Sequence, residues 1–187
     1  RYKSEIRNLL IIMILLDTGV RNGELVRIKI EDFNFRERSI YVYATKTNTF
    51  RTVYYSKETE KLLNVYRREV LKDKENGPLF LKFQSECDEP TSEGLCTDRV
   101  YNILRHKALK IFGTGFRLNP HKFRHTFATH FVINGGDPFS LRELLGHTSI
   151  ETTKIYVDMS PKDLRTKHAK HSLISNMNEQ EGVKSEY

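Results

Sequence analysis

Residues 145–156 read Leu-Gly-His-Thr-Ser-Ile-Glu-Thr-Thr-Lys-Ile-Tyr, and this stretch organises the C-terminal half of the chain. Gly146 predicts the end of a helix, because glycine readily adopts the left-handed conformation found after a helix C-terminus. Residues 148–151, Thr-Ser-Ile-Glu, have the spacing of a capping box and predict the start of another helix. His147 is therefore expected to be held between two helices, and Tyr156 follows it by nine residues.

Two helices are predicted just upstream of this stretch. One covers residues 138–145, and the other covers residues 120–133 with Asn119 as its cap and a proline at its first position. His121 and Arg124 are three residues apart in the first turn of the longer helix, so they share a face. The N-terminus of a helix suits an anion, and an arginine fork can hold two oxygens of one phosphate.

The N-terminal third combines a buried helix with a β-hairpin. Residues 4–16 are strongly apolar and predict the helix, which ends at a glycine-containing turn that carries Arg21 and Glu24. These two side chains are three residues apart, so the carboxylate could orient the guanidinium. Residues 39–55 contain two β-branched and aromatic runs, which predict an antiparallel hairpin. Lys46 lies where the first of its strands enters the turn.

The rest of the chain is predicted to be mainly helical. Ser4, Ser56 and Thr97 are expected as N-caps, of helices that run to about Leu16, Leu71 and Ile111. A second, weaker helical stretch covers 23–32, and a loop over 73–96 holds one strand at 79–81. A last helix is expected over 161–172. The predicted fold class is α+β and mostly helical, with a small antiparallel sheet packed on a helical bundle.

Composition restricts the class of protein. The chain has 187 residues, of which 38% are hydrophobic and 29% charged, as expected for one soluble globular domain. Its longest strongly apolar run has eight residues, whereas a membrane span needs about 20. A net charge of +7 favours a polyanionic partner. Cys87 and Cys96 have neither zinc-site spacing nor a disulfide framework, which favours a reducing compartment.

Together, these motifs resemble the tyrosine recombinase family, which includes phage integrases and Xer-type recombinases. The order and spacing both match, over Thr-Gly-x-Arg-x-x-Glu-Leu (18–25), a hairpin lysine 25 residues after Arg21, His-x-x-Arg-His (121–125), Leu-Leu-Gly-His (144–147) and Tyr156. The resemblance extends from Asp17 to about His171. Two hairpin positions depart from the family, Thr49 where a second lysine is usual and Tyr54 where proline is common, and they put DNA preference in doubt.

The resemblance implies a tyrosine-recombinase catalytic domain over residues 1–175, followed by a polar, flexible tail over 176–187. The family's N-terminal core-binding domain is expected to be absent from this chain. The implied enzyme cuts and rejoins DNA strands by transesterification through a 3′-phosphotyrosyl intermediate, without metal, ATP or other cofactor. The implied catalytic residues are Arg21, Lys46, His121, Arg124, His147 and Tyr156, with Glu24 in support.

Each implied role fits the chemistry of its side chain. Tyr156 would attack phosphorus and displace the 5′-oxygen, which Lys46 would protonate. Arg21 and Arg124 would clamp the non-bridging oxygens, where many phosphoryl-transfer sites use a metal. His147 would donate a hydrogen bond to the phosphate, and the other histidine, at 121, would assist proton movement near the tyrosine.

Further basic residues are candidate contacts with DNA phosphates. These are Arg51, Lys122 and Arg142, each of which could instead be a solvent-exposed side chain. His125 is a further candidate, although by family resemblance its position is expected to pack behind the site.

The resemblance also implies partners and a location. Double-stranded DNA with attachment or crossover sites is the expected substrate, bound by a homo-oligomer, a tetramer, with a possible accessory DNA-bending or excision factor. The expected protein acts in the cytoplasm at the nucleoid, without a membrane, as the integrase of a bacterial phage or mobile element. Three alternatives stay open: a type IB topoisomerase-like nicking-closing enzyme, a catalytically silent DNA-binding module on this fold, and a basic helical domain that binds nucleic acid nonspecifically.

Overall fold

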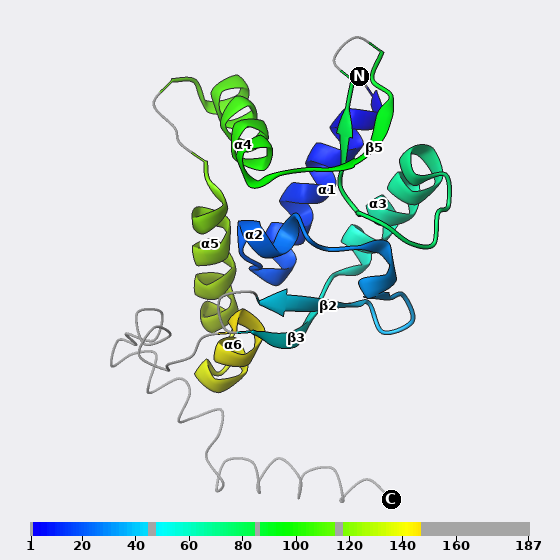
Figure 1. The fold of residues 1–187 in the computed structure, drawn as a ribbon. Helices are drawn as coiled ribbons and strands as arrows, with labels where there is room; N and C mark the ends of the chain where they lie inside the picture. The colour runs from blue at the N-terminus through cyan, green and yellow to red at the C-terminus, as the bar shows by residue number, and fades with distance from the viewer. Residues whose placement is uncertain (1, 45–47, 85–86, 115–117, 147–187) are drawn as a thin grey trace, which may run out of the picture.

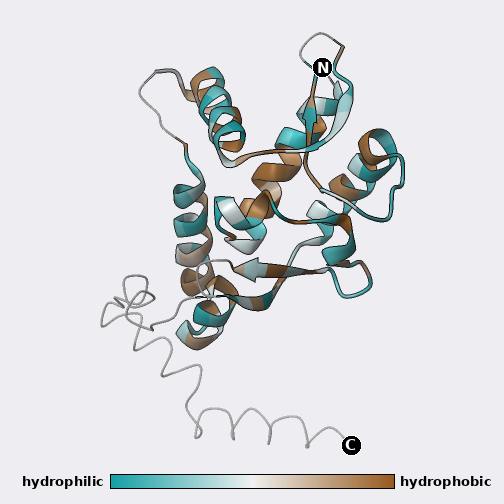
Figure 2. Ribbon diagram, in the orientation of Figure 1, coloured by the Kyte–Doolittle hydropathy of each residue, from teal (hydrophilic) through white to brown (hydrophobic). Residues whose placement is uncertain are grey.

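A central apolar helix organises the fold. The computed structural model describes residues 2–44, 48–84, 87–114 and 118–146 (Figure 1). Helix α1 (Tyr2–Thr18) contacts helices α3, α4 and α5 and strand β3. Figure 2 shows apolar residues concentrated along α1, and its Leu10, Ile11, Ile14 and Leu15 are fully buried. Burial of these side chains, each worth about 1.5–3 kcal/mol, makes α1 the core of the domain.

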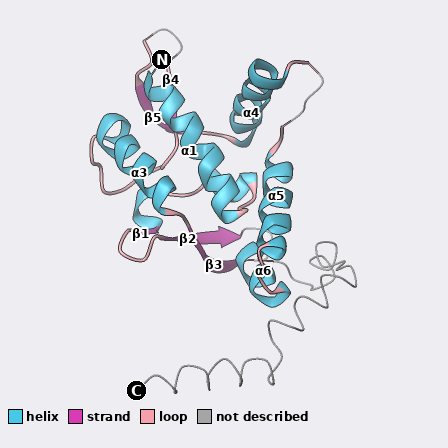
Figure 3. Cartoon of the chain, turned by 180° about the vertical axis from the view of Figure 1, so that it is seen from behind, coloured by secondary structure: helices cyan, strands magenta, loops and turns pink. Residues whose placement is uncertain are grey.

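The other elements surround α1 in chain order. They are α2 (Asn22–Leu25), a 3₁₀ turn η1 (Ile30–Asp32), β1 (Phe33–Asn34), β2 (Ser39–Ala44), β3 (Thr49–Tyr54), α3 (Lys57–Tyr66), a π-helical turn η2 (Arg67–Leu71), β4 (Leu81–Phe83), β5 (Pro90–Gly94), α4 (Thr97–Phe112), α5 (Pro120–Ile133) and α6 (Pro138–Leu145). Helices α3 and α4 lie on opposite sides of α1 in both views of the ribbon (Figures 1 and 3). A smaller apolar cluster joins α5 to α6. None of the described helices is long and apolar enough to cross a membrane.

The predicted hairpin is confirmed and belongs to a three-stranded antiparallel sheet, β1-β2-β3. Its register pairs Ile40 with Val53 and Val42 with Arg51. Side chains alternate between the two faces of a strand, so these pairs face the core while Tyr41 and Phe50 face outward. The register therefore turns the guanidinium of Arg51 toward the interior.

Local capping signals correctly predicted three helix ends. The Ser56 hydroxyl accepts a hydrogen bond from the backbone N–H of Thr59 at the start of α3. The Asn119 side chain accepts from the N–H of Lys122 at the start of α5, with proline next to the cap. Gly146 follows α6 in the left-handed conformation, at φ +63°. These predictions depend only on neighbours in sequence.

Four predictions of local structure are wrong. Helix α1 begins at Tyr2 and not after Ser4, because the Asp88 carboxylate from a distant loop accepts from the first backbone N–H groups. Cys96, not Thr97, is the N-cap position of α4. The stretch 23–32 forms only the single turn α2 and the 3₁₀ turn η1. The strand expected at 79–81 is β4, two residues later, and it pairs with β5, which was not predicted. The capping box at 148–151, the helix at 161–172 and the tail lie outside the described residues.

Gly19 makes the close approach between α1, α5 and α6 possible. Its φ is +60°, and a Cβ there would lie 2.5 Å from the Phe127 ring and 2.9 Å from Leu145 Cδ2. We expect Gly19→Ala to lower the free energy of unfolding by about 2–3 kcal/mol, from left-handed strain and overpacking together. Urea denaturation measures this. Gly23→Ala is the control, because nothing lies within 4 Å of its Cβ position; equal losses in both variants would contradict the steric argument.

Candidate active site

Three arginines from separate elements meet at the C-terminal end of α6. Arg21 is the N-cap residue of α2, Arg51 lies on β3 and Arg124 lies on α5. Each guanidinium donates to backbone carbonyl oxygens within residues 144–146. The last carbonyls of a helix have no partner within the helix, and they carry its negative end, so cations are favoured there. Cationic side chains from three separate elements therefore meet at the C-terminal end of α6.

Arg124 joins the ends of two helices. Its Nη1 donates to the carbonyl of Gly19 at 2.7 Å, and its Nη2 donates to the carbonyl of Leu145 at 2.7 Å. The residue is only 8% exposed. Gly19 ends α1 by donating its N–H to Leu15, and its turn presents the carbonyl that Arg124 binds. These two bonds fix the direction of the guanidinium before any ligand arrives.

Arg21 lies against the same carbonyl oxygen of Leu145 as Arg124 does. Its Nη1 is 3.5 Å from the carbonyl oxygen of Leu145, and its Nη2 is 3.5 Å from that of Gly146. The side chain is 32% exposed, so it also faces solvent. Arg21 and Arg124 therefore converge on one oxygen atom. Two guanidinium groups at this spacing can bind the non-bridging oxygens of a single phosphate.

Glu24 holds two of the arginines in place. The carboxylate is 4% exposed and accepts from the backbone N–H of Arg21 at 2.8 Å and from its Nη1 at 3.1 Å. It also accepts from Nη1 and Nη2 of Arg51, at 3.0 and 2.7 Å. Burial alone would raise the pKa of Glu24, but the hydrogen bonds from Arg51 and Arg21 keep that pKa below its usual value. The expected contact between Glu24 and Arg21 is present.

Arg51 is held inside the protein, not presented to DNA as the sequence suggested. Its side chain is 9% exposed, and besides the two bonds to Glu24 its Nε donates to the carbonyl of Leu144 at 2.7 Å. The strand register causes this difference, since it directs the side chain inward. Sequence reasoning missed the pairing because Glu24 lies 27 residues away along the chain.

The remaining predicted residues lie around this centre or outside the described chain. His121 and Lys122 are exposed on the first turn of α5, and Arg142 pairs with Glu143 at 2.7 Å. His125, expected to be packed behind the site, is exposed, because the inner face of α5 is taken by its neighbours at 123, 124 and 128. The described residues hold no group of three or more potential metal ligands among His, Cys, Asp and Glu.

Lys46, His147 and Tyr156 lie outside the described residues. Gly146, the last described residue, directly precedes His147 in sequence.

The fold and the paired arginines define the catalytic domain of a tyrosine recombinase. The model of the phage integrase family matches residues 1–163, and the chain belongs to this family. It is similar to tyrosine recombinase XerA of Pyrococcus furiosus, at 33% identity over 176 residues, which cover 94% of this chain and 58% of that protein. The chain therefore spans less than two thirds of this relative.

Two solved structures place the fold in the same family. The crystal structure of XerA recombinase matches with a TM-score of 0.69 and 34% identity, over 90% of this chain and 59% of that one. The catalytic domain of bacteriophage HP1 integrase matches with a TM-score of 0.57 and 27% identity, over 89% and 83% of the two chains. The second comparison covers most of that catalytic domain.

Proposed function

We propose that the chain is the catalytic domain of a site-specific DNA recombinase that forms a 3′-phosphotyrosyl intermediate through Tyr156. The main support for this proposal is that Arg21 and Arg124 both donate to the carbonyl oxygen of Leu145. Leu145 lies just before His147 in sequence, and the chain belongs to this family. XerA, XerC and XerD relatives are named as tyrosine recombinases, which supports recombination over topoisomerase activity.

The site residues supply charge and proton transfer. The Tyr156 hydroxyl oxygen forms a bond to phosphorus while the bond from phosphorus to the 5′-oxygen breaks. Arg21 and Arg124 stabilise the extra negative charge of the pentacoordinate transition state, and Lys46 gives a proton to the leaving oxygen. His121, exposed at the start of α5, would take up the proton of the tyrosine. Attack by the 5′-hydroxyl of a partner strand reverses the step and joins the exchanged strands.

The expected assembly follows from strand exchange between two duplexes. Exchange requires four cleaved strands, so a tetramer on two DNA sites is the proposed active form. Attachment or crossover sites in duplex DNA are the proposed substrate, the cytoplasm at the nucleoid is the proposed location, and an accessory DNA-bending or excision factor is the proposed partner. Lys122 and Arg142, at the edge of the site, are proposed phosphate contacts.

A covalent-adduct assay tests the proposed chemistry. A duplex that carries the candidate crossover sequence is nicked beside the cleavage point, so that the released strand end diffuses away and religation is lost. We expect a protein–DNA adduct that resists SDS and forms equally in EDTA. Digestion and mass spectrometry should place the linked nucleotide on Tyr156.

Three outcomes separate the alternatives. No adduct from protein that demonstrably binds this DNA would contradict the enzyme and leave a silent binding module. An adduct on another residue would contradict the role of Tyr156. An adduct with supercoil relaxation, but without strand exchange between two sites, would indicate a nicking-closing enzyme.

A further inference from the structure

Arg51 lies beneath the surface of the candidate site. Its side chain is 9% exposed, whereas that of Arg21 is 32% exposed. The Arg51 guanidinium meets the Glu24 carboxylate through two parallel hydrogen bonds, from Nη1 to Oε1 at 3.0 Å and from Nη2 to Oε2 at 2.7 Å. Such a fork fixes the plane of a carboxylate as well as its position. Arg51 therefore acts on the site through the groups that it binds, and not by contact with a ligand.

Both oxygens of the Glu24 carboxylate are shared between Arg51 and Arg21. Oε1 accepts from Nη1 of each arginine, and Oε2 accepts from Nη2 of Arg51 and from the backbone N–H of Arg21. A carboxylate held by Arg21 alone would be free to turn between side-chain rotamers and to take the guanidinium with it. The direction of the Arg21 guanidinium thus depends on the plane in which Arg51 holds the carboxylate.

Arg51 also holds the helix end that orients the other arginine of the site. Its Nε donates to the carbonyl of Leu144 at 2.7 Å, and the next carbonyl along the chain, that of Leu145, accepts from Arg124. Gly146 leaves room for this arrangement, because a Cβ there would lie 3.2 Å from both Cδ and Nη1 of Arg51. One buried side chain therefore connects strand β3, the end of α6 and the carboxylate.

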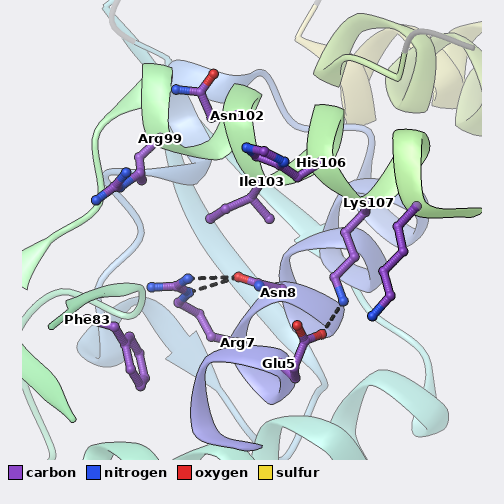
Figure 4. Close-up of a pocket in the computed structure, with 10 residues that line it drawn as sticks. Glu5, Arg7, Asn8, Phe83, Arg99, Asn102, Ile103, His106 and Lys107 are labelled. Carbon is purple, nitrogen blue, oxygen red and sulfur yellow. Dashed lines mark hydrogen bonds and ion pairs between the residues drawn. The ribbon is translucent and has the colours of Figure 1, made fainter. Parts of the chain in front are cut away.

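The carboxylate has an electrostatic role beyond holding a buried arginine. Arg7 is 6% exposed, and it donates to a backbone carbonyl and to the side-chain oxygen of Asn8, which are neutral acceptors (Figure 4). A buried guanidinium in this protein is thus held without a carboxylate. Glu24 alone would offset the positive charge of Arg21, whereas Glu24 and Arg51 together are neutral and leave that charge available to an anion.

We propose that Arg51 is a positioning residue for the transesterification, which acts through Glu24 on Arg21. The inference rests on the proposed function, because it assigns Arg21 to charge stabilisation at the reacting phosphate. Arg51 fixes the carboxylate, balances its charge and holds the end of α6. The Arg21 guanidinium consequently has its direction and its full charge before DNA binds. Charge arranged in advance stabilises a transition state without reorganisation during the reaction.

A substrate with less charge at phosphorus tests this role. The nicked duplex is made with its natural phosphate at the cleavage point, and again with a methylphosphonate, in which a methyl group replaces one charged oxygen. We expect Arg51→Met to slow adduct formation at saturating DNA by about 30-fold with the phosphate, which is less than the cost of a lost direct donor, and by less than about threefold with the methylphosphonate. The transition state on methylphosphonate carries one negative charge less, so it depends less on the charge of Arg21.

Two further variants separate positioning from a loss of stability. Leu63→Ala removes packing at a fully buried position of α3, away from the arginines, and should change the rates on the two substrates by the same factor. Arg51→Lys keeps a positive charge beside Glu24 but cannot form the fork. It should slow the phosphate reaction by about 10-fold, again with a smaller effect on methylphosphonate. It replaces Arg51→Met in every assay if that variant does not fold.

Nitrogen NMR of the Arg21 side chain separates this inference from the proposed chemistry. The bonds from Nη1 should slow rotation of the guanidinium in the protein, and its separate η-hydrogen signals should merge in the Arg51 variant. Unchanged Arg21 signals in a folded variant would overturn the inference, whether or not an adduct forms. Equal slowing on both substrates, or no slowing on phosphate, would also overturn it. No adduct from the unaltered protein would instead contradict the proposed function, and the Arg21 signals would still decide whether Arg51 positions this side chain.

Discussion

Replacing Arg124 by lysine is expected to slow formation of the covalent adduct by at least about 10²–10³-fold, the usual cost of one lost donor to a developing oxyanion. Arg124 is 8% exposed and uses separate nitrogens to bind Gly19 and Leu145. A lysine ammonium is one compact group and cannot span both carbonyls while also facing a phosphate. Single-turnover rates with the nicked duplex, at saturating DNA, measure the loss without a contribution from affinity.

A neighbouring substitution controls for this result. Lys122→Gln removes a positive charge two residues away, on the exposed side of the same helix. We expect it to weaken DNA binding while the rate at saturating DNA stays close to normal. The thermal unfolding temperature of each variant shows whether the fold is retained. If a folded Arg124→Lys variant kept more than about a tenth of the normal rate, the proposed role of this guanidinium would be wrong.

The fold was predictable where neighbours in sequence determine it. The cap at Ser56, the Asn119-Pro120 helix start and the left-handed Gly146 depend on local hydrogen bonds and sterics, and all were predicted. Strand β5 (Pro90–Gly94) contains proline and glycine, which are poor strand formers, and it exists because β4 is available to pair with it. The start of α1 depends on Asp88, more than 80 residues away. Such partners are brought together only by tertiary packing.

The candidate site was likewise predictable where neighbours in sequence determine it and not where tertiary packing does. Arg21 and Glu24 are three residues apart, so their contact followed from helical spacing, and the motif order indicated Arg124. The inward direction of Arg51 follows from the face of β3 on which it lies, whereas its charge alone favoured an exposed position. The alternating pattern of residues 39–43 and 51–55 could have indicated this direction, because it places Arg51 on the same face as Val53. An arginine on the buried face of a strand signals a buried carboxylate partner.

Replacing Arg51 by methionine is expected to lower the free energy of unfolding by about 3–5 kcal/mol at pH 7. The variant keeps an apolar stem but leaves the 4%-exposed Glu24 carboxylate without two of its hydrogen bonds, and removing one member of a buried ion pair has this cost. It also leaves the carbonyl of Leu144 without its donor. Urea denaturation measures the loss, and adding Glu24→Gln should recover part of it because the unpaired carboxylate is then absent.

The pH dependence identifies Glu24 as the source of this loss. Since folding lowers the pKa of Glu24, its ion pairs stabilise the protein fully above the unfolded pKa of about 4.3, and this stabilisation disappears as the pH falls through the folded pKa. The difference in stability between the protein and Arg51→Met should therefore shrink on acidification below about pH 4. The control is Arg142→Gln, which breaks an ion pair to the 74%-exposed Glu143 and should cost less than about 1 kcal/mol. Two results would show that the Glu24–Arg51 pair does not hold the hairpin strand to the arginine site. One is a loss of unfolding free energy in Arg51→Met that is no greater than in this control. The other is a loss in Arg51→Met that is equal at pH 7 and pH 3.5.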